Sequence, residues 1–213
     1  MKMNIVGLVC ALLTAGALIV ATPQGAKAEE NDQTIVGGIT LFGFGTTTGQ
    51  DDIRKIAFGG DTFTQVSGIY IEWNLFDRLG LTYRNMYTGT FEEGTIGGVD
   101  YVKEISTVSH ILGASFVPWI SPDGYRRLIV LGGWGPSTYT YTASIATASN
   151  SVSTSGSALM AQAAMDWGGE DFGARIGYGL LLTSYDPMKV GGTSYSVDDS
   201  NSHLYIDLRW AFK

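Results

Sequence analysis

The sequence predicts an all-β protein, an eight-stranded antiparallel up-and-down β-barrel. Stretches of about ten residues alternate large apolar with polar side chains, which is the period of a strand with two different faces. Turn-rich segments separate these stretches, and helical periodicity is scarce along a chain of 213 residues that contains 29 glycines. Short and long connections alternate, as they do in a meander whose turns lie at opposite ends.

The first 28 residues are predicted to be a cleaved secretory signal, which leaves residues 29–213 as a single barrel domain. Lys2 precedes an apolar run over residues 5–21, and the segment ends with small residues at Ala26 and Ala28. A cationic start, an apolar core and an A-x-A ending are the three parts of such a signal. A membrane-anchoring helix is the alternative, because the apolar run approaches the length of a short span. We expect cleavage after Ala28, followed by export.

The composition of the mature chain excludes several classes of protein. Its single cysteine, Cys10, lies in the signal, so an exported chain of 185 residues (213 minus 28) has no disulfide available. Removal of Lys2 and Lys27 leaves 11 of the 13 basic residues beside 20 acidic ones, a net charge of −9. This balance argues against nucleic acid as a partner, which requires clustered basic residues. No later run of 18 apolar residues predicts a membrane helix.

Eight strands are predicted, and each connection between them has a reason in the sequence. Short turns follow the second, fourth and sixth strands, where Pro-Asp-Gly at 122–124 and Gly-Gly at 168–169 favour tight turns. Pro118 marks the end of the fourth strand, because proline cannot donate to a β-ladder. Long polar loops follow the odd-numbered strands. The predicted strands are 34–45, 66–76, 79–91, 104–119, 126–142, 156–167, 172–185 and a closing strand within 202–213.

Each of the clearest strands has one apolar and one polar face. In the second strand Ile69 and Ile71 share a side, and Tyr70 lies on the other with a glutamate. Glycine blurs the alternation in the first, fourth and fifth strands, whose faces we do not assign. Alternation alone leaves two barrels open, a soluble one that buries its apolar face and a transmembrane one that turns this face to lipid.

Three features favour the transmembrane β-barrel. Aromatic residues of the apolar face gather near strand ends, which is typical of a girdle at a membrane interface. The polar face carries arginine beside carboxylates and few lysines, which is typical of a confined interior. The strands reach the roughly 9–11 residues that cross a bilayer. The predicted membrane-interface aromatics are Trp73, Trp167, Trp210 and Phe212. The predicted barrel-interior charge network is Glu72, Arg84, Asp166, Arg175, Asp207 and Arg209.

The chain resembles the small eight-stranded outer-membrane proteins of Gram-negative bacteria, of the OmpA transmembrane domain, OmpX and OmpW type. The resemblance covers residues 34–213, and its most specific element is the last strand, which ends on an almost terminal aromatic. The resemblance assigns the assembly signal in this strand to Tyr205 or Leu208, Trp210 and Phe212. Lys213 departs from the family pattern, which ends on the aromatic. The resemblance implies an integral outer-membrane location with periplasmic termini. It also implies contact with outer-membrane lipid and lipopolysaccharide, and an assembly machinery that reads the last strand.

We expect a monomer with a structural or surface-interaction role and at most a narrow pore, and no enzyme. The interior charges are interpreted as a salt-bridged plug, because eight strands enclose little more than side chains. A selectivity lining in a narrow pore is the alternative interpretation of these charges. An OmpW-like channel for small apolar molecules stays open as a second function. A lipid-modifying enzyme and a soluble periplasmic lipid-binding barrel are further alternatives.

The sequence contains no clear catalytic or metal-binding pattern. Ser109 precedes His110 and Ser202 precedes His203, but adjacent side chains of a strand point to opposite faces. Two separated histidines and no mature cysteine give no transition-metal spacing, so neither a metal nor a cofactor is expected. Acidic pairs at 51–52, 92–93 and 198–199 are interpreted as solvated loop charges, or as cation bridges to lipopolysaccharide. The Ser- and Thr-rich tract 142–156 is predicted to be a mobile loop.

Overall fold

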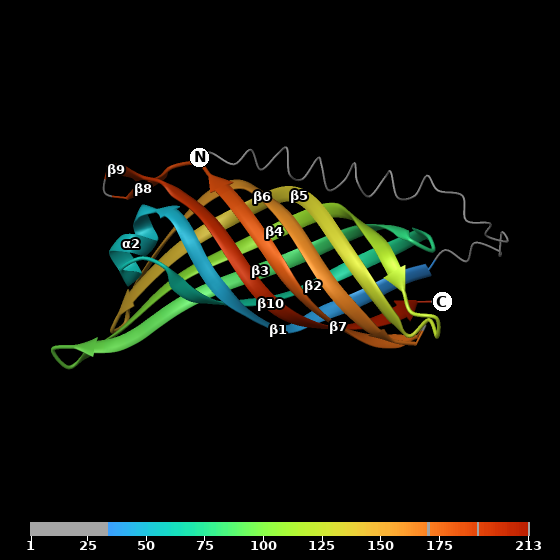
Figure 1. Cartoon of the computed structure of the whole chain (residues 1–213). Coiled ribbons are helices and arrows are strands. Elements are labelled where there is room, and N and C mark those ends of the chain that lie inside the picture. Colours follow the sequence, from blue (N-terminus) through green and yellow to red (C-terminus); the bar gives the residue numbers. More distant parts are fainter. Residues whose placement is uncertain (1–33, 170, 191, 213) are drawn as a thin grey trace.

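The structure is a computed structural model that describes residues 34–169, 171–190 and 192–212, and its main element is a closed barrel of eight antiparallel strands (Figure 1). The strands follow one another around the ring in the order β1, β10, β7, β6, β5, β4, β3 and β2. This is the predicted up-and-down barrel. The barrel strands are β1 (Thr34–Asp51), β2 (Thr62–Phe76), β3 (Leu79–Ile96), β4 (Val99–Ile120), β5 (Arg126–Ile145), β6 (Ala148–Gly168), β7 (Phe172–Tyr185) and β10 (Val197–Phe212).

Three small elements lie at the end of the barrel opposite the short turns (Figure 1). The helix α2 (Asp52–Phe58) follows β1, and β8 (Met188–Val190) pairs with β9 (Thr193–Tyr195) in a separate two-stranded sheet. No helix within the described residues is long and apolar enough to span a membrane. The predicted signal segment, its Ala26 and Ala28, and Lys213 lie outside the described residues.

The predicted strands are all present, but most continue further than the sequence indicated. The bounds of β7 are those predicted, whereas β4 begins at Val99 and runs through Pro118 to Ile120 with a register shift before Trp119. The prediction of a mobile loop over residues 142–156 is wrong. These residues form the ends of β5 and β6, paired as far as Ile145 and Ala148. Cross-strand hydroxyl pairs and the β-propensity of threonine explain why this polar tract forms strands.

Four strands extend past the rest of the barrel wall. Pairing of β2 with β3 reaches only Gly89, and pairing of β6 with β7 reaches only Gly156. The β3–β4, β4–β5 and β5–β6 pairs continue well beyond these points, toward the tips near Gly97 and Ala146. We call this extension, residues 90–109 and 137–155, the protruding sheet. Figure 1 shows the β3–β4 hairpin of this sheet reaching well beyond α2.

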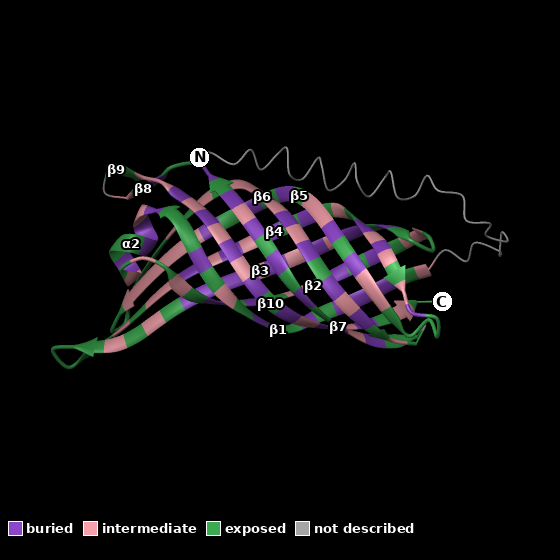
Figure 2. Ribbon diagram, in the orientation of Figure 1, coloured by how far each residue is buried: buried purple, intermediate pink, exposed green. Residues whose placement is uncertain are grey.

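The outward face of the barrel carries a belt of exposed apolar side chains. On β1 the belt runs from Ile35 to Phe44, about the length of strand that crosses a bilayer. Phe44 pairs in register with Leu204, and the next outward residues on the two strands are Thr46 and Ser202. The belt therefore ends at Phe44 and Leu204 on these strands. Figure 2 shows buried and exposed residues alternating along the strands that carry it.

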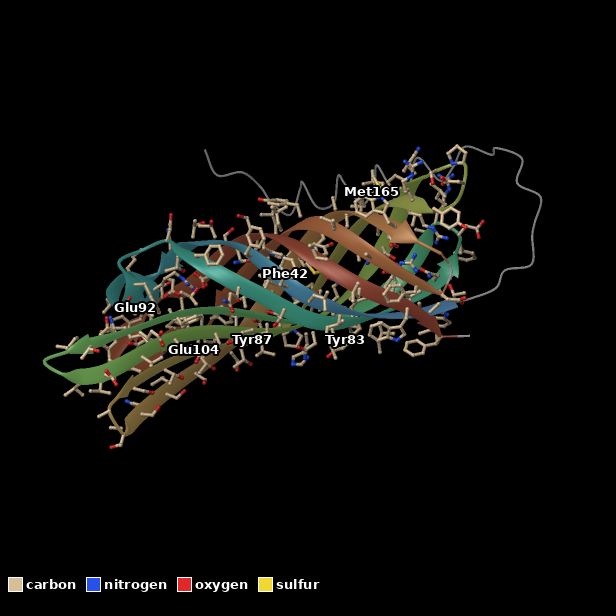
Figure 3. All side chains as sticks on the ribbon, turned by 90° about the horizontal axis from the view of Figure 1, so that it is seen from below. Phe42, Tyr83, Tyr87, Glu92, Glu104 and Met165 are labelled. Atoms are coloured by element: carbon tan, nitrogen blue, oxygen red, sulfur yellow. The ribbon has the colours of Figure 1, made fainter. Side chains whose placement is uncertain are left out.

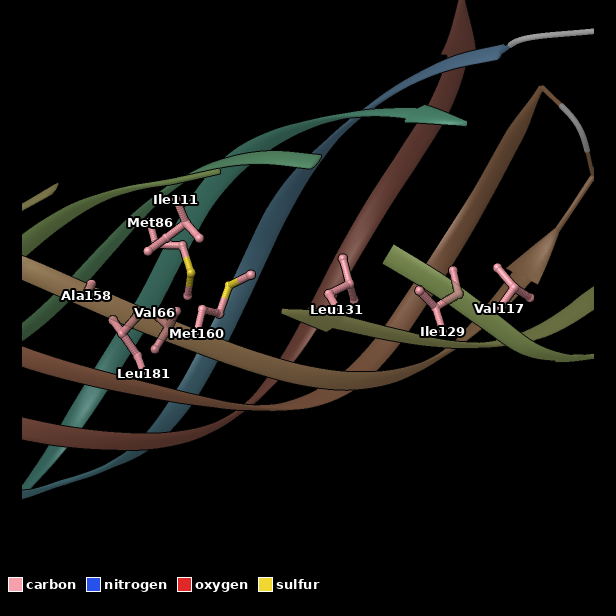
Figure 4. Close-up of a cluster of buried hydrophobic side chains, with 9 residues drawn as sticks. All are labelled: Val66, Met86, Ile111, Val117, Ile129, Leu131, Ala158, Met160 and Leu181. Carbon is pink, nitrogen blue, oxygen red and sulfur yellow. The ribbon is translucent and has the colours of Figure 1, made fainter. Parts of the chain in front are cut away.

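The barrel interior contains an apolar cluster as well as the charged residues expected from the sequence. Nine buried side chains form this cluster, and Figure 4 shows them spread along the length of the barrel. Two glycines make room for large interior rings, because a Cβ at Gly38 would overlap the ring of Tyr70 and one at Gly177 that of Tyr205. The apolar cluster comprises Val66, Met86, Ile111, Val117, Ile129, Leu131, Ala158, Met160 and Leu181.

Candidate functional site: the charged barrel interior and its lid

The structure brings all six predicted interior charges together inside the barrel. Each is at most 5% exposed, and the six lie on β2, β3, β6, β7 and β10. Arg175 pairs in register with Asp166 on one side and Asp207 on the other, so the strand alternation itself places these side chains on one face. Closure of the ring then brings Glu72 and Arg84 opposite them.

Four ion-pair contacts join the network. Arg84 Nη2 lies 3.2 Å from Asp207 Oδ2, and Arg175 Nη1 lies 3.3 Å from Glu72 Oε2. Asp166 links two arginines, because its Oδ2 lies 3.6 Å from Arg175 Nη2 and its Oδ1 lies 2.7 Å from Arg209 Nε. Buried charges need such partners, since desolvation of an unpaired ion is costly.

Neutral side chains complete the network. Ser115 donates to Glu72 over 2.9 Å, and Thr40 donates to Asp207 over 2.7 Å. The ring of Tyr70 lies between two guanidinium groups, 4.3 Å from that of Arg84 and 5.2 Å from that of Arg175. The negative face of the ring stabilises both cations where water is scarce.

A second charged cluster, which the sequence interpretation missed, lies under α2 at the opposite end. Asp51 caps the helix by accepting from the backbone N–H of Arg54 over 2.8 Å, and it accepts from the Tyr139 hydroxyl over 2.8 Å. The guanidinium of Arg54 donates to Asp199 over 2.9 Å and also reaches Thr90 over 3.2 Å. Asp51 and Asp199 are therefore buried partners of Arg54, and their interpretation as solvated loop charges is wrong. The sequence does contain a signal for this cluster, because Arg54 follows the acidic N-cap residue Asp51 by three positions.

This cluster lies beyond the apolar belt, seven residues past Phe44 on β1 and five before Leu204 on β10. Burial raises the pKa of Asp199 to about 6, although the neighbouring Arg54 opposes this shift. Burial likewise raises the pKa of Asp51 above its ordinary value. Both shifts have the same cause, because removal from water disfavours the charged form of a carboxyl group.

Apolar packing holds α2 and the β8–β9 hairpin over the end of the barrel. Buried residues from the helix, the hairpin and the inner face of the protruding sheet form one cluster, which we call the lid cluster. Lys103 on β4 also donates to the Ala57 carbonyl over 3.0 Å, which fixes the end of the helix. The lid cluster comprises Ile53, Ile105, Tyr139, Tyr185, Met188 and Val197.

The two histidines lie on opposite surfaces of the wall. His110 is exposed on the outside, where its Nδ1 lies 2.9 Å from the Tyr83 hydroxyl, and Figure 3 shows Tyr83 pointing away from the barrel. Ser109 faces inward and shares a 2.8 Å hydrogen bond with Ser137. His203 is buried and contacts Asn201 Oδ1 over 2.7 Å. Among the described residues, no group of three or more His, Cys, Asp or Glu side chains is placed to hold a metal ion.

The four predicted interface aromatics all point outward at the short-turn end of the barrel. Their exposed fractions lie between 37% and 53%, and the rings of Trp210 and Phe212 meet edge to face with centroids 6.3 Å apart. Trp73 lies on β2 and Trp167 on β6, so the aromatics lie on different parts of the wall. These aromatics form the border of the apolar belt at the short-turn end of the barrel.

Comparison with solved structures agrees with this architecture. The chain is similar to Neisserial surface protein A (NspA), with a TM-score of 0.52 and 10% identity over 86% of this chain and 100% of that chain. The fold is that of a small outer-membrane β-barrel. Ail, the attachment invasion locus protein of Yersinia pestis, covers 85% of the chain at 15% identity with a TM-score of 0.48, and 100% of Ail is covered.

The N-terminal β-barrel domain of Pseudomonas aeruginosa OprF matches 84% of this chain and 100% of its own length, at 13% identity and a TM-score of 0.40. No protein-family model matches the chain, and no curated protein sequence matches it. At these identities the likeness extends to the fold alone.

Proposed function

We propose that the protein is an integral outer-membrane barrel with a closed interior, and that it acts at the cell surface through its protruding sheet. The observation that carries this proposal is the contrast between the two parts. The barrel interior holds the charge network and is closed at one end by the lid cluster, whereas the part of the protruding sheet formed by the ends of β5 and β6 is exposed and rich in Ser and Thr. We propose a monomer without catalytic activity, whose surroundings are lipid and lipopolysaccharide.

The apolar belt supports membrane integration. Exposed Ile, Leu, Phe and Trp side chains continue around the strands, for example Ile71 at 55%, Leu112 at 69% and Trp134 at 61% exposure. A contiguous apolar surface of this kind marks a contact with lipid or another apolar partner. On β1 and β10 the outward residues that follow Phe44 and Leu204 are the polar Thr46 and Ser202. The proposed orientation therefore places the protruding sheet outside the cell and the short turns in the periplasm.

The closed interior favours a surface role over transport. An OmpW-like channel for apolar molecules would need an opening between neighbouring strands, and all eight neighbouring pairs of the ring are hydrogen-bonded. The irregularity of β1 between Thr40 and Gly43 is a bulge within a continuous ladder. An ion path along the axis would have to pass both the charge network and the Arg54 cluster.

Membrane location and closure can be measured together. We expect the protein in the detergent-resistant envelope, with a shift in gel mobility on boiling that is typical of a folded barrel. In planar bilayers we expect no steady ion current. Recovery in the osmotic-shock supernatant would instead support a soluble carrier, and a large steady conductance would contradict the closed interior.

Orientation can be tested with single cysteines, because Cys10 is the one cysteine of the chain and lies in the predicted signal. Thr147→Cys places a thiol at the tip of the β5–β6 hairpin, and Tyr125→Cys places one in an exposed short turn. A membrane-impermeant maleimide added to intact cells should label the first variant and spare the second. Labelling of Tyr125→Cys alone would reverse the proposed orientation.

A further inference from the structure

The charge network does not fill the barrel down to the short turns. Between the network and the short turns lies a cavity of about 620 Å³, which extends from Glu72 and Arg175 to the turn residue Asp77. Small-molecule sites commonly occupy about 300–1,000 Å³, so the cavity is large enough for a ligand. The proposed orientation places its mouth in the periplasm.

One basic side chain at this cavity has no partner. Arg127 on β5 shares the inward face with Ile129 and Leu131, and it is half-buried. Within the part of the chain that the structure describes, its guanidinium makes no hydrogen bond or ion pair. The preceding Arg126 points outward instead and pairs with Asp123 over 3.5 Å, with both side chains about half exposed.

The charged groups that line the cavity balance in number, but Arg127 contacts no carboxylate. Arg127, Arg175 and Arg209 line the cavity together with Glu72, Asp77 and Asp166. Glu72 and Asp166 already contact arginines of the network. Arg175, itself 1% exposed, also has a buried Nε without a hydrogen-bond partner among the described residues. Asp77 lies at the rim and makes no ion pair with Arg127.

The cavity also has an apolar lining. Val36 lies on β1, across the ring from Arg127, whereas Val117 and Ile129 lie beside Arg127 on β4 and β5, and all three are buried. A compound that occupies this space therefore meets both a guanidinium and a hydrocarbon surface. Inorganic anions satisfy only the first of these, and neutral lipids only the second.

We propose that the cavity binds an amphiphilic anion, a monocarboxylate with a short apolar chain. Its carboxylate would accept from the guanidinium of Arg127, in the paired geometry that arginine offers to carboxylates. Its chain would pack against Val36, Val117 and Ile129. Arg127 and these apolar side chains do not belong to the ion-pair network, so binding leaves the interior plug intact.

The test uses the full-length mature protein in lipid nanodiscs, with ¹⁵N-labelled arginine and octanoate as the probe. Titration with octanoate should shift the Nε–H resonance of Arg127 in a saturable way, whereas 1-octanol should leave it unchanged. Acetate and inorganic phosphate should bind at least about tenfold more weakly than octanoate, because they lack the apolar chain. Equal shifts with octanoate and octanol would mean simple partition into lipid and would overturn the proposal.

Matched variants separate the site from general effects. Arg127→Gln should weaken octanoate binding at least about tenfold through loss of a charge-assisted hydrogen bond, read from the remaining arginine resonances, while Arg126→Gln should not change it. Arg127→Lys keeps the charge and should retain part of the affinity, and Val36→Thr should weaken octanoate but not acetate. The boiling-dependent gel shift verifies folding of each variant. Unchanged octanoate affinity in Arg127→Gln, or phosphate binding as tight as octanoate, would overturn the assignment.

Discussion

Arg54 and Asp199 form an ion pair across the mouth of the barrel, with 2.9 Å between Nη2 and Oδ2. Arg54 belongs to α2 and Asp199 to β10, and the same guanidinium also donates to Thr62 on β2 and Thr90 on β3. One buried side chain thus connects a short helix to three strands of the wall. A helix of seven residues has little stability of its own, so these contacts and the lid cluster keep it in place.

Replacement of Arg54 by alanine should loosen the lid. The substitution leaves Asp199 buried without its cation, and removal of one partner of a buried pair costs roughly 3–5 kcal/mol. We expect hydrogen exchange of the α2 amides to accelerate at least about hundredfold. Lys55→Ala is the control, because the pair of Lys55 with Asp52 is half exposed and should contribute little. Equal exchange rates in the two variants would contradict the role of Arg54.

Opening of the lid should become easier as the pH rises from 4 to 7. The pKa of Asp199 is raised by burial to about 6 in the folded protein, above the ordinary value of 3.8. The closed lid therefore binds the proton more tightly than an opened, solvated one. The stabilisation is fully present below pH 3.8 and is lost as the pH passes 6, by at most about 3 kcal/mol.

Exchange of the α2 amides, corrected for the intrinsic rate at each pH, measures this effect. The charged and titratable groups that face Asp199 are Arg54, Asp51, Asp198, Tyr139 and Tyr185. Asp199→Asn removes its titration and should remove most of the pH dependence. A dependence that persists unchanged in this variant would assign the titration to Asp51 instead.

The interior charge network follows from the sequence because it depends on local rules. Period-two alternation selects the inward residues of each strand, and the short turns fix which residues of β6 and β7 lie opposite each other. Asp166 therefore faces Arg175, and the up-and-down order brings Asp207 to its other side.

The lid and the protruding sheet do not follow from these rules. Arg54 meets Asp199 only because α2 folds back over the barrel, and nothing in the alternation of β1 predicts that turn. The tract around Thr142 and Ser151 lacks the apolar face of an ordinary strand, yet the two hydroxyls pair at 3.1 Å. Strand formation there depends on neighbours in β4 and on packing of the inner face against the lid cluster.

Alanine at Gly38 should disturb the interior more than alanine at another strand glycine. A Cβ at Gly38 would overlap the Tyr70 ring, which lies between two arginines, whereas the nearest heavy atom to a Cβ at Gly132 is the Met160 carbonyl oxygen at 3.9 Å. Overpacking of this kind costs about 1–3 kcal/mol. Urea unfolding in lipid vesicles should show this loss for Gly38→Ala, and a loss no greater than about 0.5 kcal/mol for Gly132→Ala. Equal losses would show that Tyr70 moves aside freely.

Neutralisation of Asp207 should destabilise the barrel more than neutralisation of both members of its pair. Asp207 is fully buried and is the counter-ion of Arg84. In Asp207→Asn the guanidinium of Arg84 is therefore left unpaired, and a second guanidinium, that of Arg175, contacts the same Tyr70 ring. For Asp207→Asn we expect a loss of roughly 3 kcal/mol in the free energy of unfolding, measured by urea titration in lipid vesicles.

The double variant Arg84→Gln with Asp207→Asn should recover at least about 1 kcal/mol of that loss, because no unpaired charge remains buried. Arg126→Gln serves as the surface control, and its loss should stay below about 1 kcal/mol since its pair with Asp123 is half exposed. If the losses of the single variants Arg84→Gln and Asp207→Asn simply add in the double variant, Arg84 and Asp207 do not interact energetically. The network would then be a set of independent polar side chains rather than a connected plug.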